Sequence, residues 1–246
     1  MTDVYTIGIL GGMGPEATNQ LCSLVTAAAN PVNRDQDHIP VITFNNSRIP
    51  DRVSAVQGSI QQTSTDDFEN PLPEMIRTAR VLEQAGADFL IMPCNLAHYF
   101  VDEIQNAIRI PILNMIEETT RFSVREYPHA YKIGLLASTP TIQSGIFKRA
   151  FKRHERQIIS PDENIQEEKV MRAIYGSEGI KGGHKERPRA LLTEAAHHLT
   201  AQGAELIIAG CTEVSLVLEQ KDSPCPIIDP LQIIAEVAVR KARALL

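Results

Sequence analysis

Short runs of apolar residues alternate with longer amphipathic segments along most of the chain. We predict the apolar runs to be strands, over residues 6–10, 41–45, 89–93, 112–115, 132–137, 157–160, 206–209 and 227–229. Between them, apolar positions that recur with helical spacing predict helices, for example over residues 16–30, 73–85, 145–153 and 189–202. Continuous apolar strands separated by helices are typical of parallel sheets that are buried on both faces. The pattern therefore predicts an α/β fold with parallel sheets.

The two halves of the chain resemble each other. Residues 81–95 and 198–212 align without a gap, and each segment runs from a helix through Gly-Ala and an apolar strand to a cysteine. Cys94 and Cys211 are equivalent at an offset of 117 residues (211 − 94), and residue 112 matches residue 227 at an offset of 115 (227 − 112). Any two α/β units share some of this order, but an internal duplication is the economical interpretation.

From this duplication we predict two similar α/β domains related by a pseudo-two-fold repeat. The first comprises residues 1–115 together with a C-terminal helix over 230–246, and the second comprises residues 116–229.

Composition narrows the classes of function. The 246 residues are 43% hydrophobic and 22% charged, which is ordinary for a globular protein of one large or two small domains. The formal net charge is −6 and the basic residues are scattered, so we expect no nucleic-acid partner. The sequence has no apolar run long enough to cross a bilayer, and its first residues lack the features of a signal peptide. We therefore expect a cytoplasmic protein without a membrane partner.

Two of the four cysteines are candidates for chemistry. None of the four has the spacing of a zinc site or a disulfide framework, so we expect no metal. Cys94 and Cys211 each end a predicted strand and precede a helix, at the sheet edge where α/β folds bind ligands. A helix N-terminus favours a thiolate at such a position. A buried cysteine often only fills a core, but two at equivalent strand ends favour function. Cys22 and Cys225 fit structural positions.

A glycine turn follows the first predicted strand, in the order Gly11-Gly12-Met13-Gly14-Pro15. Such a turn before a helix presents backbone N–H groups to an anion. Its spacing departs from the dinucleotide pattern G-x-G-x-x-G, so a carboxylate is the expected anion. The alternative is that the glycines only permit a tight turn.

Four polar side chains could serve the two cysteines. Arg52, in the loop after the second strand, could bind a substrate carboxylate, and Lys181 lies in a glycine-rich segment that could close over a ligand. Both could equally be surface residues. His98 and Glu213 fall in the first turn after each cysteine, where they could orient the thiols or face water.

Taken in order, these motifs resemble the aspartate/glutamate racemase superfamily over nearly the whole chain, and most closely its aspartate racemases. The motifs that carry the resemblance are Gly11-Gly12-Met13-Gly14-Pro15 with Ala17-Thr18, Pro50-Asp51-Arg52, Pro93-Cys94-Asn95 with Ala97-His98, Ile180-Lys181, and Gly210-Cys211-Thr212-Glu213. The resemblance implies two Rossmann-like domains with the active site between them, and neither pyridoxal phosphate nor a metal as cofactor.

The resemblance also implies roles for single residues. Cys94 and Cys211 match the two catalytic acid/bases, and Arg52 and Lys181 match ligands of the substrate carboxylates. Asn95, Leu96 and Ala97 match a substrate-binding turn, and we expect Met13 and Thr212 to contact the substrate as well. Leu96 stands where the family usually has Thr. Glu213 stands where glutamate racemases usually have His, which favours the aspartate branch.

We therefore expect a cofactor-independent, homodimeric racemase that moves the α-proton of a small acidic amino acid, preferably aspartate, between Cys94 and Cys211. Two alternatives stay open. One is the racemisation or isomerisation of glutamate or a related acid on the same scaffold. The other, from a different class, is a two-domain protein that binds an amino acid without turning it over.

Overall fold

The computed structural model describes residues 4–61 and 69–244. The chain divides into two compact units. The first unit comprises Met1–Glu118 and Leu231–Leu246, and the second comprises Thr119–Pro230. Each unit contains one sheet, and every strand pair in both sheets is parallel. The predicted α/β fold with parallel sheets is thus confirmed.

The sheet of the first unit has three strands in the order β2-β1-β3. Its strands are β1 (Ile7–Gly11), β2 (Val41–Asn45) and β3 (Phe89–Ile91). On the outer side of β3, Leu90 forms one further parallel bridge with Ile112. This bridge extends the sheet by a single residue pair.

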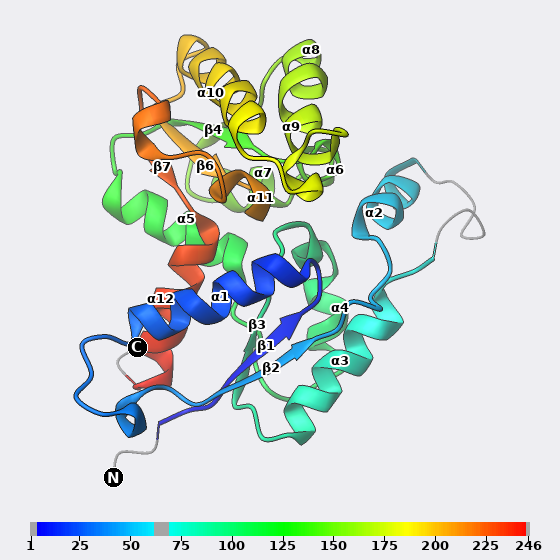
Figure 1. Ribbon diagram of the computed structural model, residues 1–246, viewed down its shortest axis with the longest axis vertical. Coiled ribbons are helices and arrows are strands. Elements are labelled where there is room, and N and C mark those ends of the chain that lie inside the picture. Colours follow the sequence, from blue (N-terminus) through cyan, green and yellow to red (C-terminus); the bar gives the residue numbers. More distant parts are fainter. Residues whose placement is uncertain (1–3, 62–68, 245–246) are drawn as a thin grey trace. The chain divides into compact units, whose positions relative to one another are not determined.

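Helices cover both faces of this sheet because successive side chains of a strand point to opposite sides. Ile7 and Ile9 pack with α1 (Pro15–Ala28) and α12 (Pro230–Ala242), drawn in blue and red in Figure 1. Leu10 belongs to a second core on the other face. That core contains the buried side of α3 (Leu72–Gln84), where Met75, Ala79 and Leu82 recur with helical spacing, and Ile104 of α4 (Val101–Gln105).

The second unit repeats this order with one more strand. Its sheet runs β5-β4-β6-β7, with β4 at Lys132–Leu136, β5 at Gln157–Ile159, β6 at Leu206–Ala209 and β7 at Ile227–Ile228. One face packs on α10 (Glu186–Ala201) and α9 (Arg172–Tyr175). Further shorter or irregular helices in the described residues are η1 (Asp35–Asp37), α2 (Arg52–Gln61), η3 (Leu96–Phe100), α6 (Thr139–Ser144), α7 (Ile146–Lys152), α8 (Glu163–Ile165), the π-helix η4 (Gln166–Met171), η5 (Ile180–Gly182), α11 (Thr212–Ser215) and η6 (Gln220–Asp222).

The helix that leads into β3 and the helix that leads into β6 end in the same way. After α3, Gly86 has φ 97°, and the N–H of Ala87 donates to Leu82 at 3.1 Å. After α10, Gly203 has φ 93°, and the N–H of Ala204 donates to Leu199 at 2.9 Å. Both are left-handed glycine caps.

The next residue is acidic in both units, Asp88 in one and Glu205 in the other. Each side chain accepts a backbone N–H at the start of the neighbouring strand, from Thr6 just before β1 at 2.6 Å and from Lys132, the first residue of β4, at 2.8 Å. The structural equivalence of the two units therefore extends to individual hydrogen bonds.

A pair of glutamines repeats as well. The side chain of Gln105 donates to the carbonyl of Ile110 at 3.1 Å and accepts the N–H of Ile112 at 2.8 Å. Gln220 does the same with Cys225 at 3.1 Å and Ile227 at 2.9 Å. Each glutamine thus satisfies both backbone groups on the open side of an edge segment, which otherwise would be available to another strand.

The strand predicted over residues 112–115 is wrong. Only Ile112 pairs with the sheet, through the bridge to Leu90, and Met115 already begins α5 (Met115–Glu126). The side chain of Asn114 accepts the N–H groups of Ile116 at 2.9 Å and Glu117 at 3.3 Å, so it starts the helix there. An apolar run alone did not distinguish a strand from the approach to a helix.

None of the helices in the described residues has the length and apolar character needed to span a membrane.

Candidate active site

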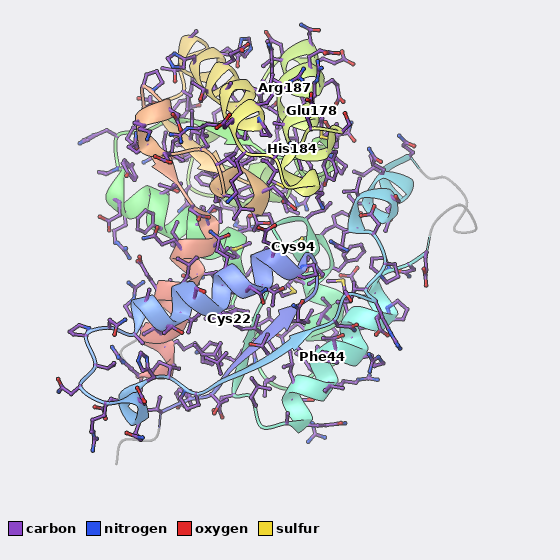
Figure 2. The ribbon with its side chains drawn as sticks, in the orientation of Figure 1. Cys22, Phe44, Cys94, Glu178, His184 and Arg187 are labelled. Carbon is purple, nitrogen blue, oxygen red and sulfur yellow. The ribbon has the colours of Figure 1, made fainter. Side chains whose placement is uncertain are left out.

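The first candidate cysteine lies just beyond β3. Cys94 follows Met92 and Pro93, and η3 begins two residues later. Its thiol is reduced and half-buried, and it packs against the first unit's core (Figure 2). The sequence places this cysteine correctly between a strand end and a helix start.

His98 is buried and holds the backbone of Cys94. Its Nδ1 lies 2.8 Å from the carbonyl oxygen of Cys94, and its Nε2 accepts the N–H of Met115 at 3.1 Å. Because Nε2 accepts, the proton is on Nδ1, which donates to the carbonyl. Burial lowers the pKa of His98 to about 4. The imidazole is therefore neutral. It does not face water, which was one of the two alternatives expected for it, and its ring nitrogens contact backbone groups rather than the thiol of Cys94.

The turn after Cys94 buries its side chains. Leu96 and Ala97 belong to the hydrophobic core of the first unit, so a ligand at this turn would meet their backbone rather than their side chains. Asn95 is 3% exposed, and neither atom of its side-chain amide has a hydrogen-bond partner among the described residues. Buried polar groups are normally paired. Asn95 therefore carries an unmet donor and an unmet acceptor next to Cys94.

The glycine turn after β1 is held by Thr18. The N–H of Gly12 donates to Thr18 Oγ1 at 3.0 Å, and that hydroxyl donates to the carbonyl of Gly14 at 2.9 Å. Gly12 has φ 96°, and a Cβ there would overlap the backbone of Asn46. The tight-turn interpretation of the glycines holds at this position, and the Gly12 N–H is already engaged. The side chain of Met13 is buried in the core.

Arg52 is the first residue of α2, and its guanidinium folds back on the loop before it. Nη1 donates to the carbonyl of Pro50 at 3.1 Å and lies 3.5 Å from that of Ile49. Its Nε is buried without a hydrogen-bond partner in the described part of the chain. The Nε–H of this guanidinium is therefore an unused donor.

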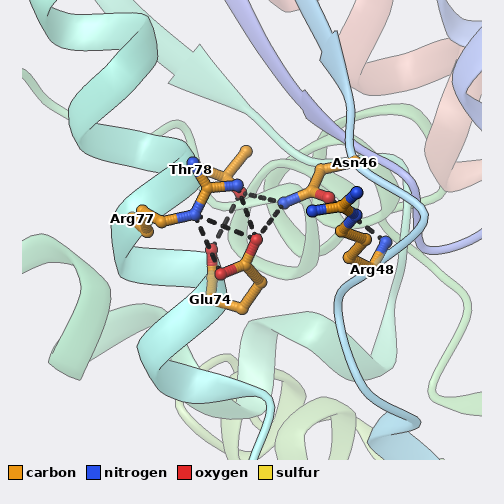
Figure 3. Close-up of polar contacts among 5 residues, drawn as sticks. All are labelled: Asn46, Arg48, Glu74, Arg77 and Thr78. Carbon is orange, nitrogen blue, oxygen red and sulfur yellow. Dashed lines mark hydrogen bonds and ion pairs between the residues drawn. The ribbon is translucent and has the colours of Figure 1, made fainter.

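A polar cluster that the sequence did not reveal fixes the end of β2 (Figure 3). The side-chain amide of Asn46 donates to Glu74 at 2.7 Å and to Thr78 at 2.8 Å, and its oxygen accepts the N–H of Arg48 at 3.2 Å. Hydrogen bonds from Arg77 and Asn46 lower the pKa of Glu74 to about 2. The cluster ties the strand end to α3, and so it supports the loop that leads to Arg52.

The second candidate cysteine lies at the equivalent place in the second unit. Cys211 follows β6 and Gly210, and it is the N-cap residue of α11. Its thiol donates a hydrogen bond to Oε2 of Glu213 at 2.9 Å. The other carboxylate oxygen lies 3.3 Å from Nζ of Lys181. Thr212, which is buried, also approaches Oε2 of Glu213, at 3.3 Å.

Glu213 remains ionised in this cluster. Burial by itself raises its pKa, but the charge of Lys181 and the hydrogen bond from Cys211 act in the opposite direction, and the net pKa lies below the ordinary value. The structure thus brings Cys211, Glu213 and Lys181 together, and the side chain of Glu213 contacts the thiol and is largely shielded from water.

The glycine-rich segment around Lys181 is a set of tight turns. Lys181 lies in η5, and its Nζ is 5.0 Å above the ring of Tyr175. Gly183 has φ 87° and ends η5. Farther on, Arg187 forms an ion pair with Glu178 (Figure 2). The side chain of Lys181 is 41% exposed, so its outer surface faces solvent.

The remaining two cysteines each contact a threonine. Cys22 approaches Thr43 at 3.4 Å, and Cys225 approaches Thr200 at 3.5 Å. Within residues 4–61 and 69–244, no three His, Cys, Asp or Glu side chains cluster as metal ligands would.

Comparisons with known proteins identify the family of the chain. The family model described as Asp/Glu/Hydantoin racemase matches residues 10–238. The broad specificity amino-acid racemase RacX of Bacillus subtilis (strain 168) is 30% identical over 241 residues, which cover 95% of this chain and 96% of the relative.

Solved structures show the same fold. The aspartate racemase of Picrophilus torridus matches with a TM-score of 0.79 and 26% identity, over 97% of this chain and 94% of that chain. The glutamate racemase isoform RacE1 of Bacillus anthracis matches with a TM-score of 0.63 and 16% identity, over 99% of this chain and 84% of that chain. The second likeness is one of fold alone. The chain belongs to the Asp/Glu/hydantoin racemase family and is an isomerase.

Proposed function

We propose that this protein racemises a small acidic amino acid, preferably aspartate, by proton transfer at Cα between Cys94 and Cys211, without a cofactor. The observation that carries the proposal is the equivalence of the two cysteines. Each follows the strand that neighbours the central strand, Gly8 pairing with Leu90 in one unit and Gly134 with Ile207 in the other. A duplicated fold that keeps a thiol at both equivalent strand ends supports one acid and one base.

The chemistry explains the need for two groups. The Cα–H of an amino acid is a very weak acid, so its removal needs a positioned base and stabilisation of the negative charge that develops on the carboxylate. Inversion needs a proton from the opposite face of Cα. One cysteine thiolate takes the α-proton, and the thiol of the other donates its own proton. The proposal therefore requires that both cysteines act on the same substrate molecule.

Polar side chains in both units support an amino-acid substrate. Asn95 offers an unmet amide donor and acceptor, and Arg52 offers an unused Nε–H. Lys181 supplies a cation in the second unit, at present beside Glu213. These groups suit a ligand that carries an ammonium and carboxylates.

A second candidate is a racemase of broader specificity, and the relative from Bacillus subtilis favours it. In the structure, the charge of Lys181 is shared with Glu213, and the side chain of Leu96 is buried in the core. Both features reduce the number of groups that would select an acidic side chain. Initial rates with aspartate, glutamate, alanine and serine separate the two candidates, because an aspartate enzyme should lose most of its kcat/KM when the side-chain carboxylate is absent.

The test is exchange of the α-proton of L-aspartate in D2O with no added cofactor. A two-base enzyme places deuterium first in the D-aspartate product, because the donor thiol carries a solvent-derived deuteron while the base still holds the substrate's proton. Equal early labelling of both enantiomers would contradict two-base transfer, and absence of exchange with any of the four amino acids would contradict racemisation of these substrates.

Cys→Ser variants identify the two thiols. We expect Cys94→Ser and Cys211→Ser each to lose nearly all exchange, because an alkoxide forms far less readily than a thiolate at neutral pH. Cys22→Ser is the matched control and should keep wild-type activity, since serine can preserve the hydrogen bond to Thr43. Near wild-type racemisation by either of the first two variants would exclude the two-cysteine mechanism.

A further inference from the structure

We propose that Glu213 is a positioning residue that holds Cys211 in its thiol form, so that Cys211 is the proton donor and Cys94 the base of the resting enzyme. The inference rests on the proposed two-cysteine function. It adds that Cys94 and Cys211, which occupy equivalent positions in the duplicated fold, have different roles in the resting enzyme.

The hydrogen bond between the two side chains has a defined direction. A carboxylate has no proton to give, so the 2.9 Å contact between Cys211 Sγ and Glu213 Oε2 requires the hydrogen to be on sulfur. The side chain of Glu213 is 16% exposed, so water competes little for this bond. The geometry therefore describes a protonated Cys211.

Charge acts in the same direction. If Cys211 lost its proton, a thiolate would lie beside a carboxylate. The repulsion between these two negative charges disfavours the thiolate form. In the described part of the chain, the titratable groups that act on Glu213 are Lys181, from η5, and Cys211 itself. Lys181 stands on the opposite carboxylate oxygen at 3.3 Å and keeps Glu213 charged, with Tyr175 of α9 below its ammonium. The acceptor thus stays anionic at neutral pH.

Among the described residues of the first unit, no carboxylate accepts a hydrogen bond from the thiol of Cys94. The residue two positions after Cys211 is Glu213, whereas the residue two positions after Cys94 is Leu96, a core side chain without a polar group. His98 bonds the carbonyl of Cys94 rather than its thiol. The two thiols therefore have different surroundings, although their strands are equivalent.

Proton balance gives this difference a consequence. In one turnover the Cys94 thiolate gains the α-proton, and the Cys211 thiol gives its proton to the other face of Cα. The enzyme then holds a Cys94 thiol and a Cys211 thiolate beside Glu213. This form is the less favourable one, and it returns to the resting form by exchanging protons with solvent or by running the reaction backwards.

The experiment measures the alkylation rate of each cysteine by iodoacetamide against pH, in the absence of substrate, with peptide mass spectrometry to separate Cys94 from Cys211. Since the thiolate is the reactive form, the rate follows its population. In Glu213→Gln the amide keeps the size and an acceptor oxygen but removes the charge. We expect the Cys211 rate at pH 7 to rise by about tenfold or more and its profile to move to lower pH, as for the loss of one neighbouring like charge. The Cys94 profile should not move.

Two further variants complete the design. Glu219→Gln removes a carboxylate of the same unit that pairs with Arg189 and Lys221, and it should leave both profiles as in the wild type. Glu213→Asp keeps the charge on a shorter side chain, so its Cys211 profile should lie between those of the wild type and Glu213→Gln. This variant tests the inference even if Glu213→Gln does not fold.

An unchanged or slower Cys211 in both Glu213 variants overturns the inference, and so does an equal shift in Glu219→Gln. The assay uses no substrate, which separates this result from the proposed function. Exchange in D2O with an unmoved Cys211 profile would refute only the role of Glu213. A shifted profile in a protein that exchanges no α-proton would refute only the racemase mechanism.

Discussion

His98 illustrates how burial determines the role of a single residue. Its imidazole is 3% exposed, donates to the carbonyl of Cys94 and accepts the N–H of Met115. Protonation would put a second hydrogen on Nε2, against an N–H that already donates to it, and would place a charge in the core. His98 therefore acts as a structural link between the Cys94 turn and the start of α5, and it does so only as the neutral ring.

This link predicts a pH dependence of stability. The folded-state pKa of His98 is about 4, below its ordinary value of 6.5, so its contribution is present above pH 6.5 and is lost as the pH falls towards 4. Linkage gives a loss of about 2–3 kcal/mol in the free energy of unfolding between pH 7 and pH 4.5.

Urea unfolding of the wild type and of His98→Asn measures this loss. The contributions of the other titrating groups to the free energy of unfolding cancel in the difference between the two proteins. Asparagine can still donate to the Cys94 carbonyl but does not titrate. His98→Asn should be less stable at pH 7 and should lose less on acidification. Parallel pH profiles for the two proteins would show that His98 does not titrate as described.

At the scale of elements, two glutamine side chains cover the open side of the edge segment of each sheet. Gln105 and Gln220 each bond one carbonyl and one N–H of the segment that follows β3 or β6 at the edge. Their helices differ, α4 in one unit and η6 in the other. The shared feature is therefore the pair of hydrogen bonds and not the helix that carries it.

We expect Gln105→Met to lower the free energy of unfolding by about 1–3 kcal/mol, because it leaves two partly buried backbone groups without their partner. Gln220→Met should cost less, since the bond to Ile227 is exposed to water. The control is Gln232→Met, which removes an exposed contact with Glu236 and should stay within about 0.5 kcal/mol of the wild type. Equal effects of all three changes in denaturant unfolding would contradict the role of the glutamine pair.

At the scale of the whole molecule, the chain passes from the first unit to the second and back again. It leaves within α5 and returns at α12, whose Leu231, Ile234 and Ala238 complete the core beside β1. The second unit is therefore an insertion into the first. A chain that ended before residue 230 would expose the apolar face of α1 and β1 that α12 covers.

Assembly also belongs to this scale, and we predict a homodimer. The grounds are the resemblance to the racemases and the prevalence of two-fold symmetric homo-oligomers among soluble proteins. Light scattering over a dilution series should give twice the chain mass of 27.2 kDa at assay concentrations. A monomer mass at every concentration would refute the prediction.

The sequence by itself determined the α/β class, most strand positions and the place of Cys94 and Cys211 at strand ends. These features depend on local patterns, namely continuous apolar runs, helical spacing and a glycine that readily adopts the positive φ of a cap, as at Gly86 and Gly203. The duplication was visible for the same reason.

Only the tertiary structure decided which partner each polar side chain meets. Lys181 and Glu213 are far apart in sequence yet form an ion pair, Asn46 reaches Glu74 and Thr78 on α3, and His98 turns to the backbone. The apolar run at residues 112–115 does not form the predicted strand, because Asn114 starts a helix there. Hydrogen bonds between distant residues depend on how whole elements pack, and no periodicity along the chain records that packing.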